Sequence, residues 1–396
     1  MINFNTLAKL PLLIKVLIAI TLGIICSLFT PLWCARIFET INAIFSQYLA
    51  FVIPLVILGL VAPSISELGS RAGKMLLATT LIAFGSTIFS GYISYFVASA
   101  TYPQIIANGI LNTVDVTNVV SCTPYFTIPM PPIMSVTSAL VLAFVLGLTI
   151  STFADRDSTL ARVIGESKEV VMLIINRSII PLLPLFIFGI FLKLGVEGSV
   201  ASVLGLFMKV VCIIFALHIV LLLTQFTIAG AIAKRNPFKT LYTMLPAYLT
   251  ALGTQSSAAT IPVTLECCRD NRVRSDVAEF IVPLCATIHL SGSILKIVAC
   301  AMAISWSSGM ATDISLYTGF IFMLAITMIA APGLPGGAIM AAMALLSSQL
   351  GFDETQCGLM VALYIAMDSF GTAGNVTGDG AIALIVNKIY SKPKNA

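Results

Sequence analysis

The sequence predicts an all-α protein that crosses a membrane several times. Of its 396 residues, 58% are hydrophobic and only 10% are charged, whereas soluble domains carry about 25% charged residues. Apolar stretches of about 20 residues, the length of a membrane-spanning helix, recur along the whole chain. Barrel strands would be far shorter and would alternate apolar with polar residues. We therefore expect a polytopic helical protein embedded in the lipid bilayer, and a net charge of only +4 gives no reason to expect a nucleic-acid partner.

The first 233 residues contain the uninterrupted apolar segments. We expect helices at about residues 11–31, 47–65, 74–100, 135–154, 170–194 and 200–233. Residues 35–39 and the charged stretch 155–168 separate these segments, so we expect both to be links outside the helices. Residues 102–132 contain five prolines and neither Lys nor Arg, which predicts a long loop or short broken segments.

The last third of the chain follows a different pattern, in which broken and intact apolar segments alternate. Small and polar residues interrupt the apolar sequence around 253–262 and again around 330–337. Each interruption is followed by an apolar segment with a polar cluster near its middle, and we expect both of these segments to be intact helices. The first polar cluster covers residues 287–293 and the second covers residues 368–379.

The distribution of Lys and Arg orients the chain in the membrane. Basic residues occur at 155–168, 234–239, 269–274 and in the C-terminal tail, which we expect to be cytoplasmic together with the N-terminus. Residues 102–132, 306–315 and 351–357 have none, so we expect them outside. The segment 240–268 then begins and ends in the cytoplasm and is too short for two spans, which predicts a re-entrant hairpin. Residues 315–351 predict a second hairpin from the opposite face, and the pair predicts an inverted repeat.

One face of the last apolar segment carries groups that are costly inside a membrane. An uncompensated carboxylate in a spanning helix costs at least about 2.5–3.5 kcal/mol, so Asp368 and Asp379 need a function. The two lie eleven residues apart, close to three helical turns, with Thr372 and Asn375 on the same stripe. The alternative is that such residues only hold helices together, and we favour that explanation for Thr377.

The two interruptions offer groups suited to a bound carboxylate and to a gate. At the first tip, Gln255, Ser256 and Ser257 provide hydroxyls and free backbone N–H groups where a helix would begin, which suits a carboxylate ligand. The alternative is an ordinary loop, which would be expected outside the membrane. The second tip, at residues 332–337, can pack closely and hinge as a gate must; the alternative is a plain external turn.

Taken in order, these motifs resemble the dicarboxylate/amino acid:cation symporter family, the glutamate transporter homologues. The serine-bearing tip, the helix after it, the Pro-Gly tip and the run from Asp368 to Asp379 carry the resemblance, together with residues 53–56 and 67–69. The resemblance implies eight transmembrane helices plus two re-entrant hairpins, assembled as a homotrimer in the cell inner membrane. It implies scaffold helices 1–2 in residues 1–73 and scaffold helices 4–5 in residues 102–199. Residues 74–101 (helix 3) and 200–396 (helix 6, hairpin 1, helix 7, hairpin 2, helix 8) would form a transport domain that moves as an elevator.

The resemblance also implies roles for individual residues. Asp368 matches the carboxylate that holds a substrate α-amino group. Asn375 and Ser257 match groups that hold the substrate carboxylate, Thr372 matches a further substrate hydroxyl, and Ser256 and Gly333 are the other candidates at the two tips. Asn375 and Asp379 match one sodium site. The candidate cation ligands are Cys285, Thr287, His289, Ser291, Asn375 and Asp379. No other metal and no cofactor are expected.

Departures from the family pattern bear on the substrate. Members that take acidic substrates have an arginine three residues after the aspartate or in the hairpin tip, and here those positions are Gly371 and Gln255. Without a cation to pair its second carboxylate, an acidic substrate would be poorly compensated. We therefore expect a symporter for a small neutral amino acid resembling serine, threonine or alanine, as in the serine/threonine:sodium branch. The alternatives are a dicarboxylate or acidic amino acid:cation symporter and an uncoupled carrier or channel. The sequence offers no nucleophile–base pair, so we expect no enzyme.

Departures at the cation sites bear on the coupling ion. The family's Asn-Met-Asp-Gly-Thr motif reads His-Leu-Ser-Gly-Ser at residues 289–293, which removes one carboxylate and one amide. Lys296 is an added cation that could occupy a vacated cation site, pair with Asp368 or Asp379, or extend to the membrane surface. We therefore expect fewer sodium ions per transport cycle, with a proton on His289 as a candidate substitute. The alternative is that His289 is a packing residue held by hydrogen bonds.

Overall fold

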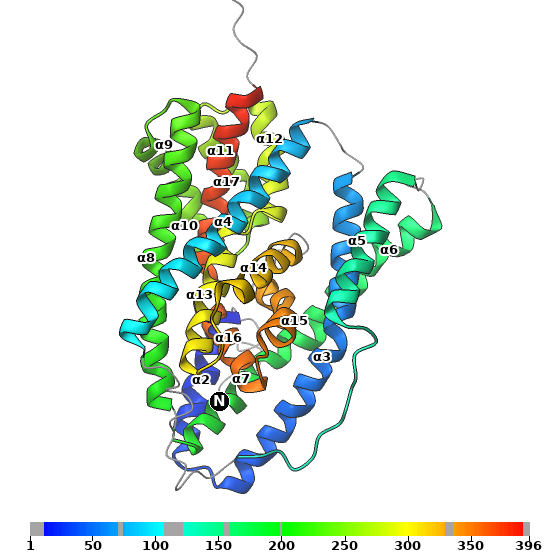
Figure 1. Ribbon diagram of the computed structural model, residues 1–396, viewed down its shortest axis with the longest axis vertical. Helices are drawn as coiled ribbons and strands as arrows, with labels where there is room; N and C mark the ends of the chain where they lie inside the picture. The colour runs from blue at the N-terminus through cyan, green and yellow to red at the C-terminus, as the bar shows by residue number, and fades with distance from the viewer. Residues whose placement is uncertain are drawn as a thin grey trace, which may run out of the picture.

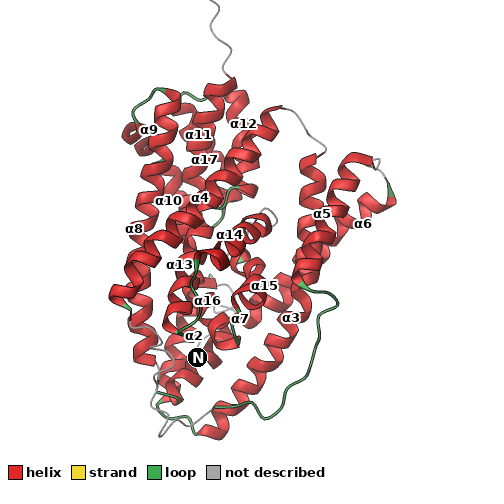
Figure 2. Cartoon of the chain, viewed as in Figure 1, coloured by secondary structure: helices red, strands yellow, loops and turns green. Residues whose placement is uncertain are grey.

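The computed structural model describes residues 12–69, 74–106, 122–153, 158–198, 200–328 and 336–390. These residues form helices and connecting loops and contain no strand (Figure 2). Five of the described helical segments are long and apolar enough to cross a membrane: Leu32–Pro63, Lys74–Ile105, Thr159–Val196, Val200–Ala233 and Ser275–Ser307. Helices α16 (Glu354–Ala366) and α17 (Asp368–Tyr390), which meet at a bend of 61°, would together make a sixth span. The chain is therefore a multi-pass α-helical membrane protein, as its composition predicts.

One group of helices comes mostly from the first half of the chain. In this group α2 (Leu12–Ser27) packs against α7 (Ile180–Val196), and α3 (Leu32–Gly69) packs against α5 (Val136–Phe153), α6 (Thr159–Ile174) and α7. In Figure 1 α3, α5 and α6 form the right-hand side of the molecule. Contacts of this group with the rest of the described chain are fewer and involve mainly α15 and α16.

The second group of helices surrounds α17. This helix packs against α8 (Val200–Ala233), α10 (Leu245–Thr254), α11 (Ser257–Asp270), α12 (Ser275–Ile288) and α13 (Ser291–Ser307). Helix α4 (Lys74–Ile105) lies along α13, and the short helix α9 (Pro237–Thr243) follows α8. Helices α14 (Ile314–Met328) and α15 (Gly337–Leu350) are the two arms of the second interrupted segment.

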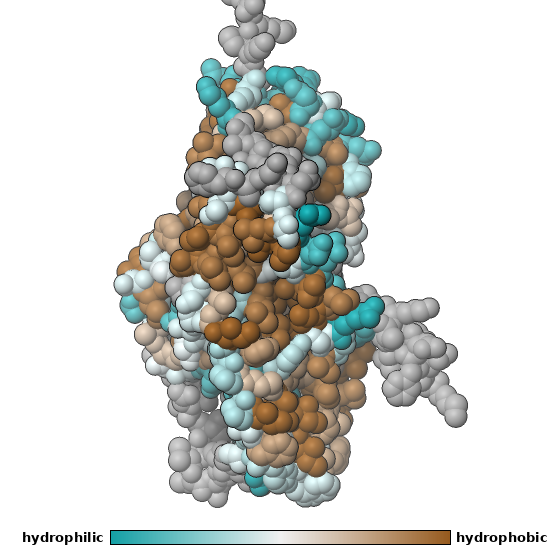
Figure 3. Space-filling view, turned by 90° about the vertical axis from the view of Figure 1, so that its right-hand side faces the viewer, coloured by the Kyte–Doolittle hydropathy of each residue, from teal (hydrophilic) through white to brown (hydrophobic). Residues whose placement is uncertain are grey.

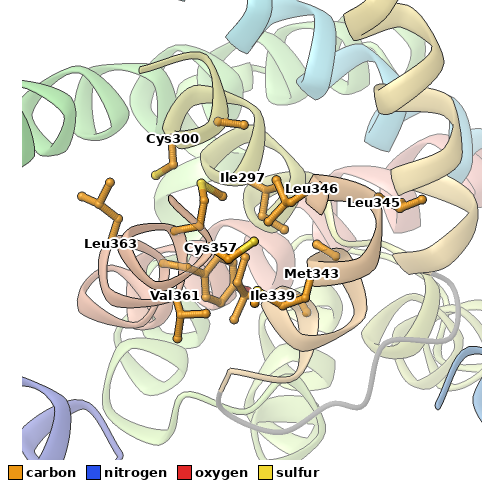
Figure 4. Close-up of a cluster of buried hydrophobic side chains, with 14 of the residues drawn as sticks. Ile297, Cys300, Ile339, Met343, Leu345, Leu346, Cys357, Val361 and Leu363 are labelled. Carbon is orange, nitrogen blue, oxygen red and sulfur yellow. The ribbon is translucent and has the colours of Figure 1, made fainter. Parts of the chain in front are cut away.

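A buried apolar cluster holds the second hairpin to its neighbours (Figure 4). Ile339 and Met343 of α15 lie beside Ile297 of α13 and Val361 of α16, and each of these side chains is at most 5% exposed. Inside a membrane the lipid tails are as apolar as these side chains, so close packing and not exclusion of water stabilises such contacts. The cluster therefore depends on shape complementarity between α13, α15 and α16.

The basic links lie together at one end of the molecule. In Figure 1 α9, the start of α12 and the end of α17 share the upper end, whereas the turn between α7 and α8 lies at the lower end. Lys234 and Arg235 precede α9, and the backbone N–H of Arg274 donates to Asn387 Oδ1 at 3.2 Å, which joins the start of α12 to the end of α17. This arrangement is the one that the Lys and Arg pattern predicts for a single membrane side.

Some helix boundaries differ from those expected from the sequence. Helix α3 begins at Leu32, so residues 35–39, predicted as a link, are helical. The polar residue that suggested a link, Glu39, is 7% exposed and forms an ion pair with Lys193 of α7, so its charge is compensated inside the bundle. The charged stretch 155–168 is likewise helical from Thr159. Ser158 caps α6 there, and the charged side chains of the helix lie on its exposed face. A π-helical turn at Ile175–Ile179 then joins α6 to α7.

The predicted loop at 102–132 is only partly described. Helix α4 continues to Ile105, past Pro103, and residues 107–121 lie outside the described residues. Residues 122–135 run as an extended connection beside α3 (Figure 2). Arg36 Nε donates to the carbonyl of Thr123 at 2.9 Å, and Thr40 Oγ1 accepts the N–H of Tyr125 at 2.9 Å. Polar residues near the start of α3 thus anchor this connection.

The outer surface carries broad apolar areas. Seen from the right-hand side of Figure 1, large apolar areas separate more polar ends (Figure 3). Val141, Val145 and Leu148 of α5 are each more than half exposed, as are Leu77 and Leu81 of α4. Apolar side chains that point outward at helical spacing are expected where a helix faces lipid.

Both segments that were expected to be intact helices are interrupted at their polar clusters. The first ends as α12 at Ile288 and resumes as α13 at Ser291, with His289 in an extended conformation between them. The second breaks at Met367, between α16 and α17. Each break frees backbone N–H groups at the start of the following helix. The expected order of broken and intact segments is therefore wrong, because both segments that were expected to be intact are interrupted.

Candidate functional site

The tip of the first hairpin contacts the start of α17. Helix α10 ends at Thr254, and Gln255 takes a left-handed backbone conformation with a φ of 54° that turns the chain into α11. Ser256 caps α11 by accepting the N–H of Ala259 at 3.3 Å. Gln255 Nε2 donates to Ser369 Oγ at 3.1 Å. The predicted tip and the predicted aspartate cluster therefore lie next to each other.

Asp368, at the start of α17, has both carboxylate oxygens engaged. Oδ1 accepts from Lys296 Nζ at 3.0 Å, and Oδ2 accepts the backbone N–H of Gly336 at 2.7 Å. Lys296 lies on α13, and Gly336 precedes α15 of the second hairpin. Of the arrangements open to Lys296, the structure shows the pairing with Asp368. The lysine side chain is 0% exposed and does not extend to the surface.

The ammonium of Lys296 is held from several sides. Besides Asp368, it donates to the carbonyl of Met367 at 3.3 Å. It also lies 3.5 Å from the ring centroid of Tyr364, in the geometry of a cation–π contact. Gly371 leaves the space that Lys296 fills: an ideal Cβ on Gly371 would lie 2.6 Å from Lys296 Cε and 2.7 Å from Nζ. The lysine thus occupies the place of a side chain at position 371.

Asn375 joins α17 to the start of α13. Its Oδ1 accepts the N–H groups of Gly292 at 2.8 Å and Ser293 at 3.2 Å, and its Nδ2 donates to Ser293 Oγ at 3.0 Å. The first N–H groups of a helix have no partner within that helix. Asn375 therefore caps α13 from a neighbouring helix, and its side chain is 3% exposed.

A second buried network of polar side chains surrounds His289, which lies between α12 and α13. Nδ1 of His289 lies 2.8 Å from Asp379 Oδ1, and Nε2 lies 3.1 Å from Ser86 Oγ on α4. Gln225 of α8 donates from Nε2 to Ser86 Oγ at 3.0 Å and to Ser291 Oγ at 3.1 Å. His289 and Asp379 are each 1% exposed. An imidazole paired with a carboxylate in this way can hold a proton as a charge-balanced pair.

The other residues that were predicted for the site take the following positions. Thr372 Oγ1 donates to the carbonyl of Asp368 at 3.1 Å, so its hydroxyl hydrogen is used within α17. Cys285 is buried, and its carbonyl accepts the N–H of His289. Thr287 is exposed and donates to the carbonyl of Leu284, so the structure does not bring its side chain into the His289 network. Ser257 begins α11 in a partly exposed position. Gly333 lies outside the described residues.

Three side chains that contribute were not identified from the sequence: Ser86, Gln225 and Tyr364. Ser86 and Gln225 stand out in retrospect as polar residues inside apolar helices, the signal that singled out Asp368. Tyr364 carries no such signal, because an aromatic residue is common in a core helix. Gly336 contributes its backbone N–H, a group that every residue except proline has.

Comparisons with known proteins agree with this architecture. The sequence profile of the sodium:dicarboxylate symporter family matches residues 12–389. The chain is 29% identical over 266 residues to excitatory amino acid transporter 3 of Homo sapiens, covering 65% of this chain and 49% of that protein. It is 28% identical over 273 residues to excitatory amino acid transporter 1 of Ambystoma tigrinum, covering 66% and 49%. It is 32% identical over 190 residues to excitatory amino acid transporter 2 of Mus musculus, covering 47% and 32%. The chain thus matches about half the length, or less, of these relatives.

Proposed function

Because the chain belongs to the sodium:dicarboxylate symporter family, we propose that it is a secondary symporter for an anionic substrate, either a dicarboxylate or an acidic amino acid. The proposal departs from the neutral amino acid that Gly371 and Gln255 suggested. That expectation rested on the lack of a cation in the pocket, and Lys296 supplies one. The family description names dicarboxylates and the relatives' names specify excitatory amino acids, which favours the acidic alternative over the serine/threonine branch.

The position of Lys296 is the observation that carries the proposal. Its ammonium lies where a side chain at Gly371 would have to be, three residues after Asp368 along α17. Members of this family that take acidic substrates have an arginine at this position or in the hairpin tip. A lysine from α13 therefore supplies the charge that an arginine on α17 would bring. Without it, a substrate carboxylate close to Asp368 would face an uncompensated negative charge in a dry site.

The hairpin tip offers a place for a substrate carboxylate. Ser256 and Ser257 stand at the start of α11, where backbone N–H groups point out of the helix and favour an anion. Gln255 fixes this tip to Ser369, one residue from Asp368. A substrate held between the tip and α17 would thus meet N–H groups on one side and the Lys296–Asp368 pair on the other.

We propose that sodium and a proton share the coupling role. Sodium requires several oxygen ligands, and Asp379 stays our candidate ligand together with Asn375. In the observed arrangement Asn375 Oδ1 accepts two backbone N–H groups, so sodium would have to compete with one of them. His289 Nδ1 lies 2.8 Å from Asp379 Oδ1, and an imidazole is a side chain that can carry a proton. A proton at this pair would balance the charge of Asp379 as a cation would.

We propose that the protein works as an elevator, in which a transport domain moves against a fixed scaffold. The two helix groups support this mechanism. Helices α2, α3, α5, α6 and α7 pack mainly with one another, and α4, α8 and α10–α13 pack around α17. This division supports our proposal of a scaffold in residues 1–73 and 102–199 and a transport domain in residues 74–101 and 200–396. We further propose a homotrimer in the inner membrane with cytoplasmic termini. The clustering of basic links at the end where α17 finishes supports the cytoplasmic position of the C-terminus.

Counterflow in proteoliposomes tests the proposed function. Vesicles preloaded with unlabelled succinate or L-aspartate are diluted into a trace of the labelled compound, with sodium on both sides. We expect accumulation of at least one of these anions and none of L-serine. Accumulation of L-serine alone would contradict the anionic substrate. Equilibration of label without counterflow would indicate a channel.

A further inference from the structure

The substrate-binding carboxylate already has a cationic partner within the protein. Asp368 Oδ1 accepts from Lys296 and Oδ2 from the backbone of Gly336, so a substrate ammonium would have to share both oxygens with donors that the protein already supplies. We propose that Lys296 is a specificity-determining residue whose ammonium takes the place of a substrate amine on Asp368. The pocket would then select dicarboxylates that lack an α-ammonium group. This inference rests on the proposed transport of anions and chooses between the two anionic classes named there.

Lys296 is placed too firmly to be displaced by an incoming amine. Its Nζ has the Asp368 carboxylate, the Met367 carbonyl and the face of Tyr364 as partners, which matches the three N–H bonds of an ammonium. Its side chain is 0% exposed, and displacement would leave a buried charge without partners. The missing Cβ at Gly371 provides the room for this position.

An α-ammonium brought to Asp368 would also meet a like charge. Any group within hydrogen-bond distance of Asp368 Oδ1 lies a few ångströms from Lys296 Nζ, where two positive charges repel each other strongly in a dry site. Replacing the amine by a hydrogen removes this repulsion and leaves both substrate carboxylates intact. The other buried carboxylate of α17, Asp379, has its Oδ1 paired with His289 Nδ1, so an amine there would have to compete with the imidazole.

Succinate and L-aspartate form a matched pair for the test, because they differ only by the α-ammonium group. Binding to the purified full-length protein is measured by isothermal titration at saturating sodium. We expect succinate to bind the wild-type protein at least about tenfold more tightly than L-aspartate, since one charge-assisted hydrogen bond accounts for such a factor. In Lys296→Met, Asp368 becomes available to an ammonium, and we expect the ratio to shift by at least about tenfold toward L-aspartate.

Two further variants control for charge and for the loss of an ion pair. Lys296→Arg keeps the positive charge and should keep the preference for succinate. Lys193→Met breaks the partly buried Lys193–Glu39 pair in the scaffold group and should leave the ratio unchanged. Folding of each variant is checked by gel filtration and thermal unfolding.

The outcomes separate this inference from the proposed function. Wild-type protein that binds L-aspartate as tightly as succinate would refute the role of Lys296 and leave anion transport standing, whether or not the variants fold. A folded Lys296→Met variant with an unchanged ratio would refute it as well. Failure of the wild-type protein to bind either anion would refute the proposed function itself, and this inference with it.

Discussion

Lys296 fills the space in which a side chain at Gly371 would have to lie. The two residues come from different helices, α13 and α17, and the lysine ammonium would be 2.7 Å from an ideal Cβ on Gly371. One residue of this pair supplies a charge and the other supplies room for it. Changes at Gly371 therefore test the position of Lys296 without altering the lysine itself.

Gly371→Arg is expected to lower substrate uptake by at least about tenfold, because the new side chain collides with Lys296 and adds a second cation beside it. Uptake of labelled succinate into proteoliposomes measures the effect. Gly319→Ala on α14 is the control, since a Cβ there meets nothing within 4 Å. The double variant Gly371→Arg with Lys296→Met has one cation again and should regain uptake relative to Gly371→Arg. Equal uptake by wild type and Gly371→Arg would contradict the position of Lys296.

Asn375→Ala is expected to destabilise the protein through the start of α13. The change leaves the N–H groups of Gly292 and Ser293 without the partner that they have in the wild type. A buried donor without a partner costs about 1–3 kcal/mol. Thermal unfolding in detergent measures the loss, and Asn375→Asp, which keeps an acceptor oxygen at the same place, should lose less. An unchanged midpoint for Asn375→Ala would show that α13 does not depend on this cap.

The sequence allowed the individual residues of the site to be predicted, but not which of them are in contact with each other. The tip at Gln255 and Ser256 could be located because small polar residues interrupt an apolar run, and Asp368 and Asp379 because carboxylates are costly in a membrane. Which cation meets which carboxylate depends on the register between α13 and α17, and no local pattern encodes that register. Lys296 was therefore left with several candidate positions. The breaks at His289 and Met367 were missed for a related reason, since contacts from Asp379, Asn375 and Lys296 stabilise chain ends that look helical locally.

Cys122 is expected to resist thiol reagents in the folded protein. It lies outside the membrane helices, is 1% exposed, and burial together with the nearby Glu39 and Glu197 carboxylates raises its pKa to about 11. Only the thiolate reacts, so a pKa two units above the ordinary 9.0 lowers the reactive fraction about 100-fold near neutral pH.

Maleimide labelling of variants with a single cysteine measures this reactivity. A protein with only Cys122 should label slowly when folded and fully when denatured, and faster as the pH rises toward 11. A protein with only the half-buried Cys34 is the comparison. Glu197→Gln should speed labelling of Cys122, because it removes a carboxylate that accepts the Cys122 N–H and disfavours the thiolate. Rapid labelling of folded wild-type Cys122 would contradict the anchoring of residues 122–135.

We expect uptake to respond to both a sodium gradient and a pH gradient, because His289 places an imidazole, which can bind a proton, 2.8 Å from Asp379 Oδ1 where the family motif has an amide. Protonation at an acidic outer face would charge the imidazole and balance Asp379, and release in a more alkaline cytoplasm would end the cycle. Among the described residues, the buried thiols of Cys268 and Cys285 are also close enough to interact with Asp379.

Three proteins distinguish a proton site from a packing role for His289. Uptake is measured in proteoliposomes with sodium and pH gradients imposed singly and together. In His289→Asn we expect the response to the pH gradient to disappear while the response to sodium persists. Ser86→Ala removes the Nε2 partner of the imidazole and keeps its pair with Asp379, so it should keep the response to pH. A steep dependence on sodium with no response to pH, the same in wild type and His289→Asn, would mean that His289 only packs against Asp379 and that sodium alone drives transport.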